Sequence, residues 1–84
     1  MNAQQQLAYL YSLGQGVAQN HQLAAYWFEK AALQGDAISQ NRLGKLYERG
    51  LGVNQDLAKA KKLYRQAADQ GHQIASINLR MLDN

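Results

Sequence analysis

The chain has 84 residues, a formal net charge of +3 and no cysteine, and 46% of its residues are hydrophobic. This length predicts one small domain, and the lack of cysteine excludes disulfides and thiolate metal sites as sources of stability. No apolar run approaches the ~20 residues of a membrane span, and no basic segment followed by an apolar stretch opens the chain. We therefore expect no membrane partner and a cytoplasmic location, or a periplasmic or secreted one if a leader has been removed.

Apolar residues at three-and-four spacing predict five helices, with glycines between most of them. The predicted helices span residues 3–13, 21–34, 37–49, 57–70 and 73–82. In the first of them the apolar face is formed by Ala3, Leu7, Leu10 and Tyr11. We call the first, third and fifth helices the A helices, and the second and fourth the B helices.

The helix ends carry their own signals. Asn20 and Asp56 precede the two B helices, where a small polar side chain can cap free backbone donors. Gly14 and Gly50 follow A helices and are expected to adopt the left-handed conformation that ends a helix. The B-helix stripes, rich in alanine, are expected to be core: Ala24, Trp27, Phe28, Ala31 and Ala32, and then Ala60, Leu63, Tyr64, Ala67 and Ala68.

The chain also repeats itself at an offset of 36 residues. LYSLGQGVAQN over Leu10–Asn20 returns as LYERGLGVNQD over Leu46–Asp56, and EKAALQG returns as RQAADQG. A fixed period of this size is typical of stacked repeats, in which each unit covers its neighbour's apolar face. We expect a single domain over residues 1–84, with repeat one at about 1–36, repeat two at about 37–72, and a capping helix at about 73–82 with a polar outer side.

The motifs LY-x-x-G-x-G-V, A-x-x-W-F-x-x-A-A-x-x-G and LG-x-LY resemble those of the Sel-one-like repeat (SLR) family, a relative of the tetratricopeptide repeat. The resemblance covers nearly the whole chain. It implies an all-α fold, a right-handed α/α superhelix whose A helices line a concave groove. It also implies an adaptor or scaffold that holds other proteins, and it implies no reaction.

Carried over by position, the groove is expected to combine an amide and cation centre with apolar ends. The expected groove residues are Gln5, Tyr9, Ser12, Leu13, Asn41, Lys45, Glu48, Arg49, Ile77 and Met81. Such a surface suits an extended or helical segment of a partner protein. The alternative is that these residues are the solvated faces of a short solenoid.

The function predicted from these observations is a noncatalytic protein–protein interaction module, as an adaptor, a scaffold or an immunity-type binder. No catalytic residue, cofactor site or metal site is expected, because the acids are dispersed and His21 and His72 begin helices in different repeats. The alternative is a small-ligand or β-lactam-binding, enzyme-like protein of this family. The relatives of that kind carry cysteine pairs, which this chain lacks.

Two further surfaces have alternative interpretations. Lys59, Lys61, Lys62 and Arg65 could form a nucleic-acid surface, although a charged, solubilising helix face is the favoured interpretation. Large apolar residues near the ends of the solenoid predict either end-to-end packing into a homodimer or the cut edge of a longer array. These residues are Leu13, Ile74, Ile77 and Met81.

Overall fold

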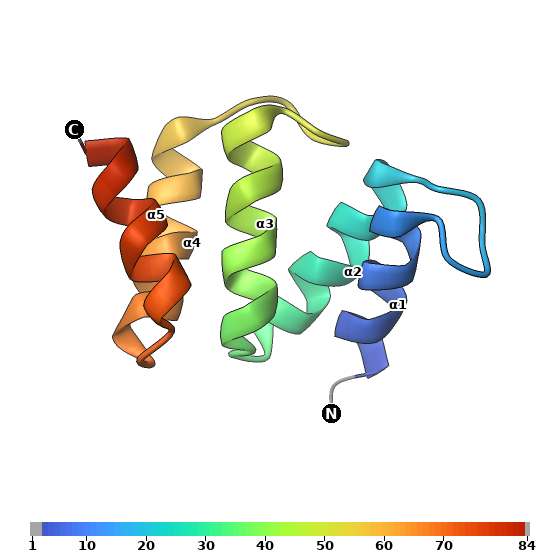
Figure 1. The fold of residues 1–84 in the computed structure, drawn as a ribbon, viewed down its shortest axis with the longest axis horizontal. Helices are drawn as coiled ribbons and strands as arrows, with labels where there is room; N and C mark the ends of the chain where they lie inside the picture. Colours follow the sequence, from blue (N-terminus) through green and yellow to red (C-terminus); the bar gives the residue numbers. More distant parts are fainter. Residues whose placement is uncertain (1–2, 84) are drawn as a thin grey trace.

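The computed structural model describes residues 3–83, which form five helices and no strand (Figure 1). The helices are α1 (Ala3–Leu13), α2 (His21–Leu33), α3 (Ala37–Arg49), α4 (Leu57–Asp69) and α5 (Gln73–Asp83). Each helix packs against the next one in the chain and runs in the opposite direction, so the A helices α1, α3 and α5 share one direction. The predicted all-α solenoid is confirmed, and the predicted helix ends differ from the observed ones by at most one residue.

Small polar side chains cap the helix starts, as predicted for Asn20 and Asp56, and Asp36 caps α3 in the same way. The side chains of Asn20, Asp36 and Asp56 each accept a hydrogen bond at 3.0 Å from a backbone N–H three residues later in the chain. The donors are Leu23, Ser39 and Lys59. The imidazole of His72 does the same for α5, because its Nδ1 accepts the N–H of Ala75 at 3.2 Å. Each cap satisfies one of the backbone donors that a helix start leaves without an intrahelical partner.

The loops that join the A helices to the B helices have the same structure in both repeats. Gly50 ends α3 with a φ of 68°, the left-handed conformation that glycine adopts without strain. Further along the loop, the N–H of Asp56 donates to the carbonyl of Tyr47 at 2.9 Å. The first repeat has the matching bond from Asn20 to Tyr11, also at 2.9 Å.

The second glycine of the repeat-two loop lies against the preceding repeat. A Cβ atom added to Gly52 would lie 2.7 Å from the backbone nitrogen of Gln22 and closer still to the carbonyl group of His21. Its counterpart in repeat one, Gly16, has a similar φ of 76°, but an added Cβ there would meet no heavy atom of the described chain within 4 Å. Gly52 is therefore required by a contact between repeats as well as by backbone conformation.

The hydrophobic core lies where successive helices meet. Phe28, Leu43, Leu46 and Leu63 supply its large side chains, and small alanines between them let the helices approach closely. The core alanines are Ala8, Ala24, Ala25 and Ala32. The half-buried residues that pack against the core are Tyr11, Trp27, Tyr47, Leu51 and Val53.

Gly44, the only glycine inside a described helix, makes room for an aromatic ring of α4. A Cβ atom at this position would lie 2.7 Å from Cε1 of Tyr64, which is fully buried. The equivalent pair in the first repeat is Ala8 with Phe28, which are both buried. Tyrosine is thus paired with glycine in the second repeat, and the smaller phenylalanine is paired with the larger alanine in the first. This compensation is expected because protein interiors pack at a nearly fixed density.

One buried amide connects the two repeats. Nε2 of Gln40 in α3 donates to the carbonyl of Ala32 in α2 at 3.2 Å. Oε1 of Gln40 accepts a hydrogen bond at 2.9 Å from Nε2 of Gln70, which follows α4. The amide therefore has partners on both sides, as a buried polar group requires.

Two predicted core positions of α1 are exposed. Ala3 is exposed and Leu10 is 37% exposed, whereas the counterpart of Leu10, Leu46, is 8% exposed. The difference arises because α3 packs between α2 and α4, whereas among the described helices α1 packs closely against α2 alone.

The exposed surface of α5 is partly polar, with Arg80 and Asp83 on it, and it also carries an apolar row. Ile74, Ile77 and Met81 lie at helical spacing on one face and are exposed, Met81 to 68%. The opposite face contacts α4 through the buried Ala75. The polar end of the helix is engaged elsewhere, because Asp83 forms an ion pair at 3.1 Å with Lys61 of α4.

Candidate functional site

The outward surfaces of the A helices form the candidate site. On α3 these residues follow one another at helical spacing: Ile38, Arg42, Lys45 and Arg49. They lie opposite the buried positions of the same helix, such as Leu43. We define the A-layer face as these four residues together with Gln5, Gln6, Tyr9 and Leu13 of α1 and Ile74, Ile77 and Met81 of α5.

Arg42 joins α3 to α1 on this face. Its guanidinium carbon lies 4.7 Å from the ring centroid of Tyr9, which is a cation–π contact. A cavity of about 510 Å³ adjoins this contact and is lined mainly by apolar and amide groups. Its lining residues are Gln5, Gln6, Tyr9, Leu10, Gln15, Ile38 and Arg42.

Two asparagines join α3 to α5. Nδ2 of Asn78 donates to Oδ1 of Asn41 at 2.9 Å, and Asn41 is buried. The side chain of Asn41 therefore connects neighbouring A helices and is not free on the surface. Gln5 and Ile77 occupy the equivalent positions of α1 and α5, and Ile77 remains 50% exposed.

Glu48 is engaged in the contact between α3 and α4. Its Oε1 accepts a hydrogen bond at 2.6 Å from the hydroxyl of Tyr64. Burial, followed by this bond and the Glu48 charge, raises the pKa of Tyr64 well above its ordinary value. The carboxylate of Glu48 thus stabilises the protonated phenol and is held in the contact between α3 and α4.

Ten residues were expected to line the groove, and the structure places them in two groups. Gln5, Tyr9, Leu13, Lys45, Arg49, Ile77 and Met81 lie on the A-layer face. Ser12, Asn41 and Glu48 instead bond within the fold, Ser12 by donating its hydroxyl hydrogen to the Tyr9 carbonyl at 2.7 Å. Whether the first group binds a partner stays a prediction.

The sequence argument missed Ile38 and Arg42. Both are exposed, and together with Lys45 and Arg49 they complete one row along α3. The signal that could have found them is present in the sequence. Their spacing to Lys45 is helical, and at the offset of 36 residues Arg42 corresponds to Gln6 and Asn78. Positions that differ between copies are where a solenoid can encode its partner.

The basic cluster of α4 is partly neutralised. Lys59 lies 3.7 Å from Glu29 and 4.6 Å from the ring centroid of Tyr47, and Lys61 pairs with Asp83. A hydrogen bond to Tyr47 is the largest cause that raises the pKa of Lys59. Lys62 and Arg65 are exposed and have no ion pair with any residue of 3–83. Two of the four basic residues are therefore neutralised within the fold.

Neither a metal centre nor a membrane span is built by the described residues. Within 3–83, no three His, Cys, Asp or Glu side chains gather closely enough to hold a metal ion. His72 already serves as a helix cap. No helix in this part of the chain combines the length and the apolar character that crossing a bilayer requires.

The pair of helices that the chain repeats also matches a known family. The Sel1 repeat model fits the chain twice, over residues 2–36 and 37–72. The chain belongs to the Sel1 repeat family. Sel1 repeats generally act as protein–protein interaction modules. Among curated proteins, no sequence matches this Sel1 chain.

Two crystal structures of Sel1 repeat proteins are similar to this one. A Sel1 repeat protein from Oxalobacter formigenes has 40% sequence identity and a TM-score of 0.91 over 93% of this chain. The antigen c5321 of uropathogenic Escherichia coli, described as protective and as having an SLR fold, has 41% identity and a TM-score of 0.89 over 90% of this chain. The chain spans 59% of the first protein's length and 16% of the second's.

Proposed function

We propose that this Sel1 chain is a noncatalytic interaction module that binds an acidic peptide segment of a partner protein across the A-layer face. The observation that carries this proposal is the charge pattern of the face. Arg42, Lys45 and Arg49 lie along α3, and the residues of the face on α1 and α5 are uncharged. Of the two acids of these helices, Asp83 forms an ion pair with Lys61, and Glu48 is turned toward α4, where it accepts a hydrogen bond from Tyr64.

The apolar residues that flank this cationic row define the rest of the partner. Tyr9 and Leu13 are exposed on α1, and Ile77 and Met81 are exposed on α5. Large apolar groups gathered at an exposed surface favour contact with another molecule. Directly packed helices lie about 8–10 Å apart, and the A helices pack mainly against the B helices, so a segment that reaches from α1 to α5 needs at least about six extended residues. We therefore expect a segment with acidic residues at its centre and apolar residues at its ends.

The binding test uses fluorescent hexapeptides in an anisotropy titration. The probe has two glutamates at its centre and leucines at both ends, and a matched peptide has lysines in place of the glutamates. We expect only the acidic peptide to bind, and Lys45→Glu to weaken it about tenfold. The matched control is Arg65→Glu, which makes the same charge change on exposed α4 and is expected to have little effect.

Three results would contradict the proposal. The first is equal affinity of the acidic peptide for the unmodified chain and for a double variant that combines Tyr9→Ala with Lys45→Glu, because the A-layer face would then take no part in binding. Equal binding of the acidic and basic peptides would remove the electrostatic argument. Tighter binding of an oligothymidine probe, with the steep salt dependence of phosphate contacts, would favour the nucleic-acid alternative instead.

We also propose that the chain catalyses no reaction and uses no cofactor. The support is that its polar side chains serve the fold: Asp36 and Asp56 cap helices, and Glu48 pairs with Tyr64. Hydrolysis of a chromogenic β-lactam tests the alternative suggested by some relatives of the family. Turnover above the buffer rate, retained after repurification, would contradict the noncatalytic assignment.

The exposed row of α5 offers a competing use for two of these residues. Ile77 and Met81 could be covered by a second copy of the chain in place of a peptide. Light scattering over a wide concentration range separates the two. We expect the chain to be a monomer that binds peptide. A dimer that dissociates when peptide is added would instead show that the second copy and the peptide compete for the same surface.

A further inference from the structure

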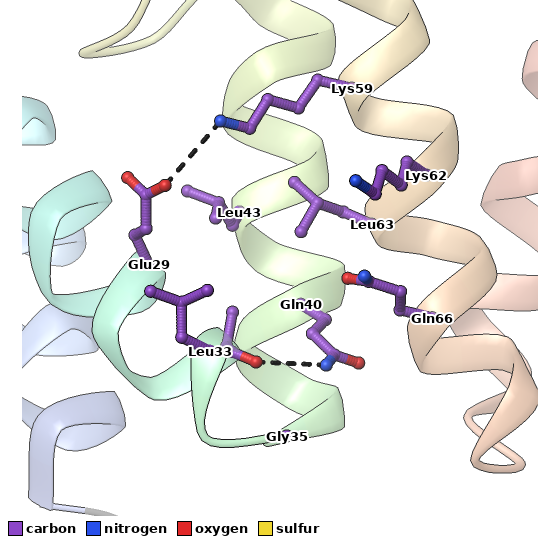
Figure 2. Close-up of a pocket in the computed structure, with 10 residues that line it drawn as sticks. Glu29, Leu33, Gly35, Gln40, Leu43, Lys59, Lys62, Leu63 and Gln66 are labelled. Carbon is purple, nitrogen blue, oxygen red and sulfur yellow. Dashed lines mark hydrogen bonds and ion pairs between the residues drawn. The ribbon is translucent and has the colours of Figure 1, made fainter.

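A second hollow lies on the side of the molecule formed by the B helices (Figure 2). It has a volume of about 370 Å³ and lies between α2 and α4, with α3 behind it. This volume is within the range of about 300–1,000 Å³ that is typical of ligand pockets. It shares no residue with the A-layer face, so the two surfaces can be occupied independently.

The interior of this B-layer pocket combines apolar side chains with the buried amide of Gln40. Ala32, Leu43 and Leu63 line it, and all three are buried in the core. Leu33 lines its α2 side and is 83% exposed, more than any other large apolar residue described. A leucine in water forgoes the favourable free energy of burial, and here it adjoins the apolar part of the pocket. The second repeat has Asp69 at the equivalent position, so the repeat itself does not require leucine.

The α4 side of the pocket is polar and basic. Lys62 lines it and has no carboxylate within ion-pair distance among residues 3–83. The amide of Gln66, one helical turn along, likewise has no hydrogen-bond partner in the described chain. At one end, Lys59 and Glu29 reach across the opening and form an ion pair at 3.7 Å (Figure 2). An occupant would therefore meet leucines on one side and a free cation on the other.

We propose that the B-layer pocket is a second protein-docking site, which takes a large aliphatic side chain of a partner together with an adjacent carboxylate. The aliphatic group packs against Leu33, Leu43 and Leu63, and the carboxylate binds Lys62 and Gln66. An apolar anchor in a pocket with a polar rim is the usual form of an energetic centre in protein interfaces. The net charge of +3 favours the approach of an acidic segment. With sites on opposite layers, one chain can hold two proteins at once.

The test is a titration of isotope-labelled protein followed by amide chemical shifts. The probe is a short peptide with one Glu-Leu pair in a Gly-Ser background, and the matched peptides carry Lys-Leu or Glu-Ser. We expect Glu-Leu alone to give saturable shifts at Leu33, Leu63 and Gln66, with a Kd of about 1 mM or lower. Leu33→Asp, which introduces the residue of the second repeat, should weaken binding about tenfold, and Leu33→Ser serves as a second variant.

The cation is tested by two charge reversals on one helix. Lys62→Glu should weaken the Glu-Leu peptide about tenfold, whereas Arg65→Glu, on the same helix but outside the pocket, should change its Kd by less than about threefold. Equal losses in both variants would overturn the proposal, because binding would then follow net charge alone.

Two other outcomes would overturn it as well. Shifts at Arg42 and Lys45 in place of Leu33 would move the peptide to the A-layer face. Binding of decanoate without binding of the peptide would make the pocket a site for free amphiphiles. Failure of this experiment leaves the A-layer proposal intact, because the variants and the reporting amides belong to different surfaces.

Discussion

The contact between the repeat-two loop and α2 predicts that two equivalent glycines differ in how much stability they contribute. Gly52 and Gly16 occupy the same place in the two loops, with φ of 74° and 76°. Replacing either with alanine imposes the same left-handed conformation on a residue with a Cβ atom. Only at Gly52 does that atom meet the backbone of His21 and Gln22.

The magnitude follows from these two effects. The left-handed conformation costs an alanine about 1–2 kcal/mol, so Gly16→Ala should lower the free energy of unfolding by that amount. Insertion of a methyl group into a packed contact costs about 1–3 kcal/mol more, because backbone must move. Gly52→Ala should therefore cost about 2–5 kcal/mol in all. For a domain of this size, each kcal/mol corresponds to about 4–8 °C in Tm.

Urea denaturation of both variants, followed by far-UV circular dichroism, measures this difference. The unmodified chain and Gly16→Ala are the references, so the backbone effect cancels and the contact between repeats remains. We expect the urea midpoint of Gly52→Ala to be lower than that of Gly16→Ala. The dependence of the free energy of unfolding on urea concentration should be unchanged in Gly16→Ala. Midpoints of the two variants that agree within error would refute the contact as a source of stability.

Three further variants test the pairs described above. Tyr64→Phe should lower stability by about 1 kcal/mol at neutral pH through loss of the bond to Glu48, measured by urea titration. The raised pKa of Tyr64 in the folded state favours its protonated form, so stability should fall as pH rises above about 10, by up to about 1.4 kcal/mol per pH unit. In melting curves, Tyr64→Phe should flatten this fall. An unchanged dependence of stability on pH would contradict the assignment. Gly44→Ala should cost about 1–3 kcal/mol alone, because the added methyl group meets Cε1 and Cδ1 of the Tyr64 ring. It should cost less in the Tyr64→Phe background, where the ring keeps these carbons but has lost its bond to Glu48 and is free to shift, and a double-mutant cycle that shows additivity would argue against this coupling. Asp56→Ala should cost about 1 kcal/mol by removing the acceptor of the Lys59 N–H, and an unchanged melting temperature would exclude that cap as a stabilising contact.

The helices could be predicted closely because their ends are encoded locally. Asn20, Asp36 and Asp56 cap the helices that follow them, and Gly50 ends α3, so each boundary depends on a few neighbouring residues. Burial was harder to predict, because it depends on which helices pack on each side. Leu10 and Leu46 share a sequence context but differ in exposure, since only the helix that carries Leu46 packs between two others.

The candidate site was only partly predictable for a related reason. A position carried over from a repeat pattern gives the direction of a side chain but not its partner. Asn41 was expected to face a ligand and instead bonds to Asn78, and Glu48 bonds to Tyr64. Both partners are more than a dozen residues away, and no local spacing indicates such bonds. The B-layer pocket was missed because it arises only where residues of α2, α3 and α4 come together.

The buried amide of Gln40 has a consequence for how this solenoid unfolds. Repeat arrays are nearly one-dimensional, and a weak junction lets one unit melt while its neighbour stays folded. Gln40 is held by Gln70 within its own repeat and donates across the junction to the carbonyl of Ala32, so separating the repeats leaves this amide N–H and this carbonyl without each other. That penalty applies only to the half-unfolded state. We therefore expect the two repeats to melt as one cooperative unit, with similar protection of their backbone amides from hydrogen exchange.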